Sequence, residues 1–415
     1  MEAKELLELR PALYRYLNKF KDCIKTKPSR KHFRTYISGQ LSSLDRKSVE
    51  PIALEAGVPP RTLQEFLSLH AWDHKAVATR LRAIVQKKHA SPNAIAVIDE
   101  TGCPKKGDKT VGVQRQWCGA TGKTDNCVVN VHLGYVAQNF HALIAGDLYL
   151  PKSWAEDQER RATAGVPEEL EFRTKWQIAL DLLDQSLEEG VEFCWLVADE
   201  EYGKVGEFRR QVSQRGLFYV VEVPKTVCCW LSKPKVLPER KRYKLKTKKA
   251  RLAEGEPQAT QISQLWADCA PPWNSFLVKE SEKGPIVWQA WEQSVFLYDK
   301  GLPGEEVRLV IARQPLTGEI KYFLTNAPLD VELAEILSIA FSRWNIEQLF
   351  KEAKGEVGYD HFEVRKYKAL QRHLVITQVS LYFLLERANK FGKKKSLVVS
   401  AASEACAGTT TSGSE

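Results

Sequence analysis

Two apolar runs that each end in an aspartate constrain the fold of this chain more than any other feature. Residues 94–98 lead into Asp99, and residues 193–198 lead into Asp199. Runs of this length and composition are typical of buried strands. We therefore expect both carboxylates at one edge of a sheet, where a carboxylate is costly unless it is hydrated or binds a cation. In the alternative interpretation, both aspartates are turn or helix-cap residues that follow strands.

Helical periodicity over residues 331–354 contains a third acid, Glu347. At 3.6 residues per turn, Arg343, Glu347 and Lys354 share one face of the predicted helix. The neighbouring core-facing stripe consists of Ile346, Leu349, Phe350 and Ala353. Carboxylates on a strand, a strand and a helix suit two Mg²⁺ or Mn²⁺ ions acting on a phosphodiester. The alternative is an exposed ion pair between Arg343 and Glu347.

The net charge of +9 is concentrated in three segments of the chain. Residues 1–90 carry a net +9, residues 225–251 a net +10 and residues 363–395 a net +7, so the remainder is acidic. A polyanionic partner accounts for this distribution, because each contact of Lys or Arg with a phosphate releases a condensed counterion. The alternative is that these segments are solvated surface loops.

The order of periodicities predicts an α/β chain in five parts. The first is an all-helical DNA-binding region, in which a helix closed by Gly57 and followed by Pro59 and Pro60 indicates a helix-turn-helix or an ordinary helical hairpin. Three meander strands, a helix and a further buried strand then follow the order of a ribonuclease H-like core. The predicted parts are residues 1–90 (helical region), 91–223 (first part of the core), 224–328 (β-rich insertion with a basic segment), 329–395 (C-terminal helices of the core) and 396–415 (disordered tail).

Motifs around the three acids resemble the DDE-superfamily transposases of bacterial insertion sequences, over about residues 90–370. The third motif, Arg343-x3-Glu347-x6-Lys354, is similar to the family's Tyr-Arg-Glu-Lys signature. The other motifs are IDETGCPKKG at 98–107, QRQWCG at 114–119, GKTDNC at 122–127 and ADEEYG at 198–203.

This resemblance implies a ribonuclease H-like catalytic domain with an inserted β-rich domain. It also implies DNA strand cleavage and strand transfer with two metal ions, and binding of double-stranded DNA at terminal inverted repeats and at the target. By position, Asp99, Asp199 and Glu347 would be the catalytic metal ligands. Handling two element ends at once implies a homodimer on DNA.

The sequence departs from the family's pattern at three positions. Ala340 stands where the signature has its tyrosine, so the contact of that phenol is absent or supplied by another residue. Glu100 stands where many relatives carry Asp, and Cys103 where they carry an aromatic residue. None of these changes alters the three acids.

A wider set of residues is expected to contact DNA. Trp288 and Trp291 are candidates for stacking on an unpaired base, the alternative being a place in the core. The irregular spacing of the cysteines and histidines between residues 118 and 141 does not favour zinc. The basic candidates are Arg343, Lys354, Lys105, Lys106, Lys109, Lys241, Arg242 and Lys244.

Composition limits the other classes of protein. No apolar run reaches the roughly 18 residues of a membrane helix. An odd number of scattered cysteines without a CxxC pair indicates a reduced, cytosolic compartment. The resemblance to bacterial transposases implies that this compartment is the bacterial cytoplasm with its nucleoid. Two alternatives to a transposase stay open. One is a DNA-binding regulator that keeps the fold without the chemistry, and the other is a ribonuclease H-like nuclease that acts on RNA or repair intermediates.

Overall fold

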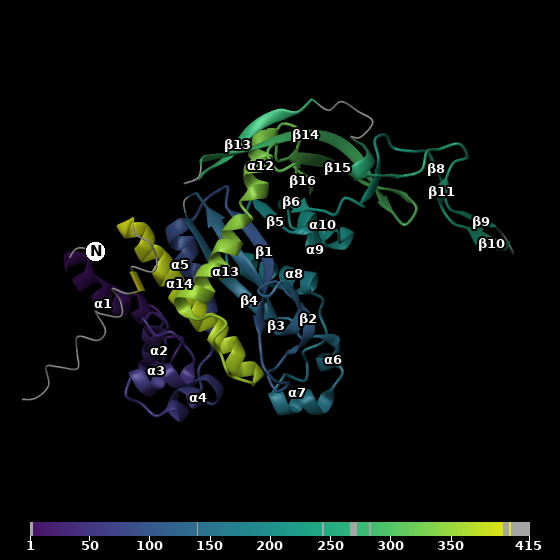
Figure 1. The fold of residues 1–415 in the computed structure, drawn as a ribbon. Helices are drawn as coiled ribbons and strands as arrows, with labels where there is room; N and C mark the ends of the chain where they lie inside the picture. The colour runs from purple at the N-terminus through teal and green to yellow at the C-terminus, as the bar shows by residue number, and fades with distance from the viewer. Residues whose placement is uncertain are drawn as a thin grey trace, which may run out of the picture. The chain divides into compact units, whose positions relative to one another are not determined.

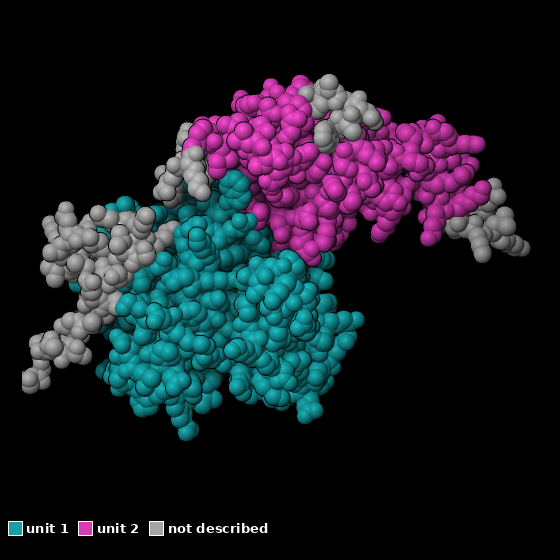
Figure 2. Space-filling view, viewed as in Figure 1, with its two compact units in different colours: residues 1–193, 344–415 teal, residues 194–343 magenta. Residues whose placement is uncertain are grey.

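The structure, a computed structural model, describes residues 3–138, 140–242, 245–265, 272–281, 284–392 and 398–399 (Figure 1). The chain divides into two compact units, residues 1–193 with 344–415 and residues 194–343, which Figure 2 colours separately. Each unit has its own strands and helices. Lys244 lies outside the described residues, as does the tail predicted to be disordered apart from Val398 and Val399. In the described part of the chain, no helix is both long and apolar enough to cross a membrane.

The first unit opens with helices, as the sequence predicts. Thr26 and Asp73 cap two of them, because their side chains accept hydrogen bonds from main-chain N–H groups in the first turn. Gly57, at φ 64°, forms the turn between α3 and α4, where the helix-turn-helix is predicted. The helices are α1 (Ala3–Asn18), α2 (Lys27–Gln40), α3 (Val49–Glu55), α4 (Pro60–Ser68) and α5 (His74–His89).

A buried polar network joins these helices to the long helix α14 (Tyr367–Phe391), which lies beside them in Figure 1. The Tyr36 hydroxyl lies 3.0 Å from His373 Nδ1. Gln40 donates to Thr377 Oγ1 at 2.8 Å and accepts from Ser380 Oγ at 2.7 Å. Because these groups are buried, their hydrogen bonds fix the N-terminal helices and α14 in one core.

The strands of the first unit centre on β3 (Lys123–Ala137). The strand β1 (Ile95–Pro104) pairs with it antiparallel over ten residues, and β2 (Gln114–Cys118) and β4 (Phe140–Leu148) are also antiparallel to it. β3 is almost wholly buried, because helices cover the sheet. The remaining helices of this unit are α6 (Lys152–Ala155), α7 (Gln158–Ala164), α8 (Lys175–Glu188) and α13 (Trp344–Val357).

The second unit contains a mixed sheet in the order β12-β7-β14-β15-β16-β6-β5, with β13 on β14. β5 and β6 are parallel, and the other neighbours are antiparallel. Residues 224–328 therefore continue the sheet of β5 and β6, through the pairing of β16 with β6. The sheet strands are β5 (Trp195–Ala198), β6 (Phe218–Glu222), β7 (Cys228–Trp230), β12 (Thr260–Gln261), β13 (Asn274–Ser281), β14 (Gly284–Asp299), β15 (Leu302–Arg313) and β16 (Ile320–Thr325). The helices are α9 (Glu200–Gly203), α10 (Gly206–Gln214), α11 (Ile262–Leu265) and α12 (Leu333–Phe341).

Candidate active site

Asp99 lies in the middle of β1. The prediction that the first strand ends at Asp99 was wrong, because β1 continues to Pro104 along the long partner strand β3, and the small residues that follow Asp99 are buried there. The Asp99 side chain is half-buried, and its Oδ1 accepts a hydrogen bond from Glu100 N at 2.7 Å. The carboxylate is thus held on a paired strand and not on a loose turn.

The Asp99 carboxylate is on the face of the sheet that α13 covers. Asp99 is directly opposite His132 in the register of β1 and β3, and paired residues project from the same face. The His132 ring lies 5.4 Å from the ring of Phe350 on α13, and its Nε2 lies 2.7 Å from the Tyr359 hydroxyl. Burial lowers the pKa of His132 to about 4, so a neutral imidazole stands beside Asp99 at neutral pH.

Two contacts fix the direction of α13 along β1. Near the start of the helix, Ile346 Cδ1 and Val97 Cβ both lie 3.6 Å from the position that a Cβ would take on Gly134. Toward its end, Lys354 Nζ donates to Gly102 O at 3.0 Å. The contacts span about 12 Å of helix and about 16 Å of strand. The two elements therefore run in the same direction.

Glu347 is exposed in the first turn of α13, one residue after Ile346. Because Ile346 packs beside Val97, Glu347 lies at the same height along the sheet as the part of β1 between Val97 and Asp99. It is on the helix that covers the Asp99 face. The predicted core-facing stripe is confirmed, since Ile346, Leu349, Phe350 and Ala353 are all buried. The first unit thus brings Glu347 and Asp99 to the same level of two facing elements.

Asp199 belongs to the second unit. It directly follows β5, as predicted, and it is also the N-cap of α9, because its Oδ1 accepts from Glu201 N at 3.0 Å. Gly203 allows α9 to lie tightly on β6, since a Cβ there would be 2.0 Å from Glu222 O. The strand and the cap together define the main-chain position of the Asp199 carboxylate.

The donor set of these acids fits a hard divalent cation, because Mg²⁺ and Mn²⁺ prefer carboxylate oxygens and water. Within the described ranges, no group of three or more His, Cys, Asp or Glu side chains is arranged to hold a metal ion. Two of the predicted ligands lie in the first unit and the third in the second. The fit of these residues to a metal therefore rests on the chemistry of their oxygen donors.

The structure assigns different surroundings to the predicted DNA-binding cations near Asp99. Lys105 forms its contacts within the protein. Its Nζ donates to the carbonyls of Asp360 and Phe362, both at 2.8 Å, and lies 3.5 Å from the Phe362 ring centroid. Lys106 and Lys109 are exposed. The ammonium group of Lys354 donates to the main chain of β1 and so links α13 to that strand.

Arg343 is not on the helix that carries Glu347. The helix predicted through Arg343 is broken there, because Ser342 caps α12 by donating to Ile339 O at 2.6 Å. Arg343 occupies the turn before α13. Lys241 and Arg242 lie on the strand β9 (Arg240–Arg242), and nothing is described of their side chains.

The two candidate tryptophans of the second unit differ in burial. Trp288 is 2% exposed and packs against Phe341, with ring centroids 4.8 Å apart, so it follows the core interpretation. Trp291, also on β14, is half-buried.

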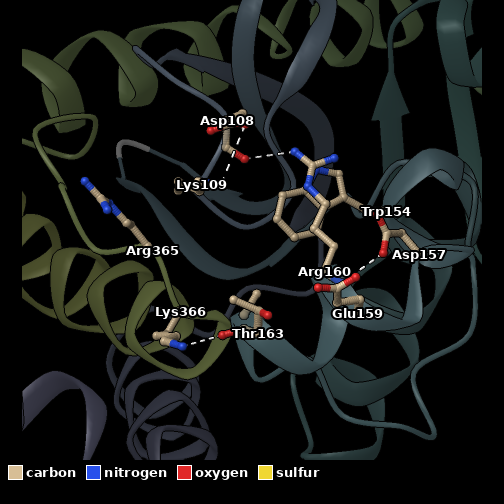
Figure 3. A pocket seen from close by; sticks show the side chains of 10 residues that line it. Asp108, Lys109, Trp154, Asp157, Glu159, Arg160, Thr163, Arg365 and Lys366 are labelled. Atoms are coloured by element: carbon tan, nitrogen blue, oxygen red, sulfur yellow. Dashed lines mark hydrogen bonds and ion pairs between the residues drawn. The ribbon is translucent and has the colours of Figure 1, made fainter.

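Figure 3 shows a pocket of about 530 Å³ in the first unit that the sequence reasoning missed, apart from Lys109. The guanidinium of Arg160 lies 3.7 Å from the Trp154 ring centroid and donates to Asp108 O at 2.9 Å. Arg365 and Lys366 line another side of the pocket, and Lys366 donates to Thr163 O. Its residues come from three separate stretches of the sequence, residues 108–109, 154–164 and 365–366, so no local motif could have revealed it.

Comparison with known proteins identifies the class of this chain. Residues 19–284 match the family of DDE superfamily endonucleases, and because this is more than half of the chain, the chain belongs to that family. The matched range contains Asp99 and Asp199 and ends before Glu347.

A curated relative carries a more particular description. It is the probable transposase for insertion sequence element IS701 of Microchaete diplosiphon, which is 34% identical over 188 residues. The match covers 45% of this chain and 46% of the relative, so the chain spans about half the length of the relative that it matches.

Proposed function

We propose that this protein is the transposase of an insertion sequence, which binds terminal inverted repeats, cleaves DNA and transfers the cut strand to target DNA. The observation that carries the proposal is the placement of Asp99 opposite the helix of Glu347, in a chain of the DDE endonuclease family. We further propose a ribonuclease H-like core of the Tyr-Arg-Glu-Lys subgroup. The similarity to the IS701 transposase supports the choice of substrate.

In this proposal, Asp99, Asp199 and Glu347 would hold two Mg²⁺ or Mn²⁺ ions. Such ions would lower the pKa of an attacking water or 3′-hydroxyl and would stabilise the leaving oxygen. The paired strand β1 and the cap of α9 hold two of the carboxylates at defined main-chain positions. We assign the exposed Lys106 and Lys109 and the half-buried Arg343 to the phosphates of the bound strand, because cations at these positions would neutralise the backbone charge.

We also propose that the protein acts as a homodimer on DNA in the bacterial cytoplasm. Transposition joins two element ends to one target, and two copies of a single site meet that requirement. The three basic segments support DNA as the polyanion.

The proposal is tested with a labelled duplex that carries the inverted repeat flanking the gene. We expect a new 3′ end at the tip of the repeat with Mg²⁺ or Mn²⁺, and none with EDTA. A second reaction with an unlabelled plasmid should yield joined products. Preferential cutting of an RNA–DNA hybrid would instead support the nuclease alternative.

A silent DNA-binding regulator is the second candidate. The observation that favours it is that Asp99 and Asp199 each accept a hydrogen bond from a main-chain N–H group, and that Asp199 caps a helix, so both acids also have a structural role. Binding of the repeat with no cutting under either ion would support this function and would contradict the proposed transposase.

A further inference from the structure

A thin antiparallel ribbon leaves the sheet of the second unit between β7 and β12. It consists of two strand pairs, β8 (Val236–Leu237) with β11 (Arg251–Leu252) and β9 with β10 (Leu245–Lys248), and in Figure 1 these pairs follow one another away from β14 and β15. Leu237 pairs with Arg251 and Arg240 pairs with Lys248 in the same register, so the two pairs are continuous. The register shifts only farther along the ribbon, between Lys248 and Leu245. The two pairs are one ribbon, interrupted at Pro238, which has no N–H group for the ladder.

The ribbon is basic, and those of its charged side chains that the structure describes face solvent. Five cations with described side chains are exposed on it, and none of them forms an ion pair with another described residue. Segment 225–251 contains 11 Lys and Arg and a single acid, Glu239. The exposed cations are Lys235, Arg240, Lys248, Lys249 and Arg251.

The register adds an observation that composition does not contain. Arg240 and Lys248 are directly opposite each other, and like charges at such a position destabilise an antiparallel pair. A two-stranded ribbon alone is only marginally stable in water. An anionic partner would remove this repulsion and order the ribbon.

We propose that this ribbon lies in the major groove of duplex DNA. The inference rests on the proposed function for its partner, and the shape supports the groove. A two-stranded ribbon fits a groove about 12 Å wide. The two sides of the ribbon, residues 236–242 and 245–252, have seven and eight residues. They extend about 23 to 26 Å, which is enough to cross the groove and reach the phosphates on both sides.

The test is a salt titration of duplex binding with a charge-matched control. The ribbon variant removes three of its exposed cations, and the control removes three exposed lysines from other parts of the chain. Each lost phosphate contact lowers the slope of log Kd against log salt by about 0.9, so we expect the slope to fall by as much as about 2.7 in the ribbon variant only. The ribbon variant is R240Q/K248Q/K249Q, and the control is K152Q/K204Q/K300Q, whose lysines are exposed and lie outside the three basic segments.

Methylation of guanine N7 by dimethyl sulfate then locates the contact, because N7 lies in the major groove. We expect a set of guanines that wild type and control protect and that the ribbon variant leaves reactive. An unchanged slope, or the same protection in all three proteins, would overturn the proposal. Absence of duplex binding by the wild type at low salt would overturn it as well.

The outcomes separate this inference from the proposed function. Groove contacts by the ribbon in a wild type that never cuts DNA would refute the transposase and leave the ribbon assignment standing. Tip cleavage together with an unchanged salt slope would support the transposase and refute the ribbon assignment.

Discussion

His373 shows how a single buried residue couples the first unit to pH. It is fully buried, with Nδ1 3.0 Å from the Tyr36 hydroxyl and Nε2 2.9 Å from Tyr359 O. Burial lowers its pKa from 6.5 to about 4. The unfolded chain therefore binds a proton more readily than the folded protein between these pH values. Folding loses stability as the pH falls through this window.

We expect His373 to contribute a loss of about 2 kcal/mol in the free energy of unfolding between pH 7 and pH 5. The variant H373Q cannot titrate there, so its free energy of unfolding should change less over the same interval. Urea denaturation of both proteins at the two pH values measures the difference. An identical pH dependence in the two proteins would show that His373 is not protonated on unfolding.

At the scale of elements, the close packing of α9 on β6 determines where the second unit holds Asp199. The variant G203A should be destabilised by about 1–3 kcal/mol, because the added Cβ would overlap Glu222 O. G206A is the matched control, since its Cβ would meet only the flexible ends of Arg209 and Arg210 at 3.5 Å. Denaturant midpoints compare the two variants. Equal midpoints would contradict the tight packing.

Arg372 joins α14 to the C-terminal end of α4. Its buried guanidinium donates to the carbonyls of Phe66, Leu67, His70 and Trp72. R372M leaves these acceptors without their donor, so we expect it to cost about 3 kcal/mol or more of unfolding free energy. The exposed pair of Arg61 and Glu65 provides the control, and R61M should leave the denaturant midpoint unchanged. A loss of similar size in both variants would contradict the stabilising role of the hydrogen bonds from Arg372 to these carbonyls.

Local patterns in the sequence predict the elements well where one period dominates. The apolar stripe of α13 and the strand before Asp199 follow directly from spacing. The sequence does not predict that β1 runs past Asp99, because pairing with β3 is a long-range interaction. Nor does it predict the break before α13, which depends on how Ser342 caps the preceding helix.

The candidate site can be predicted only in part from the sequence, because it also depends on long-range contacts. Motif positions select the acids, but the face on which Asp99 lies follows from its partner His132 and from the packing of Phe350. Charge alone gives no indication that Lys105 is bound to two main-chain carbonyls whereas Lys106 is exposed. Tertiary contacts decide which of two neighbouring lysines is available to DNA.

At the scale of the whole molecule, the chain of this endonuclease family carries its three candidate acids on two units. We propose that Asp99, Asp199 and Glu347 act together in cutting DNA. D99N, D199N and E347Q remove each charge while keeping the shape of the side chain. E201Q is the matched control. Glu201 lies two residues beyond Asp199, is exposed and forms an ion pair with Lys204.

The most direct measurement is the rate of tip cleavage by these four variants under Mg²⁺ and Mn²⁺, with binding of the repeat confirmed for each by gel shift. We expect each triad variant to lose cleavage by at least about 100-fold with binding retained, and E201Q to cut at nearly the wild-type rate. Cleavage at the wild-type rate by E347Q would contradict the account and direct attention to Glu356, since Glu352 is buried and bound to Gln348.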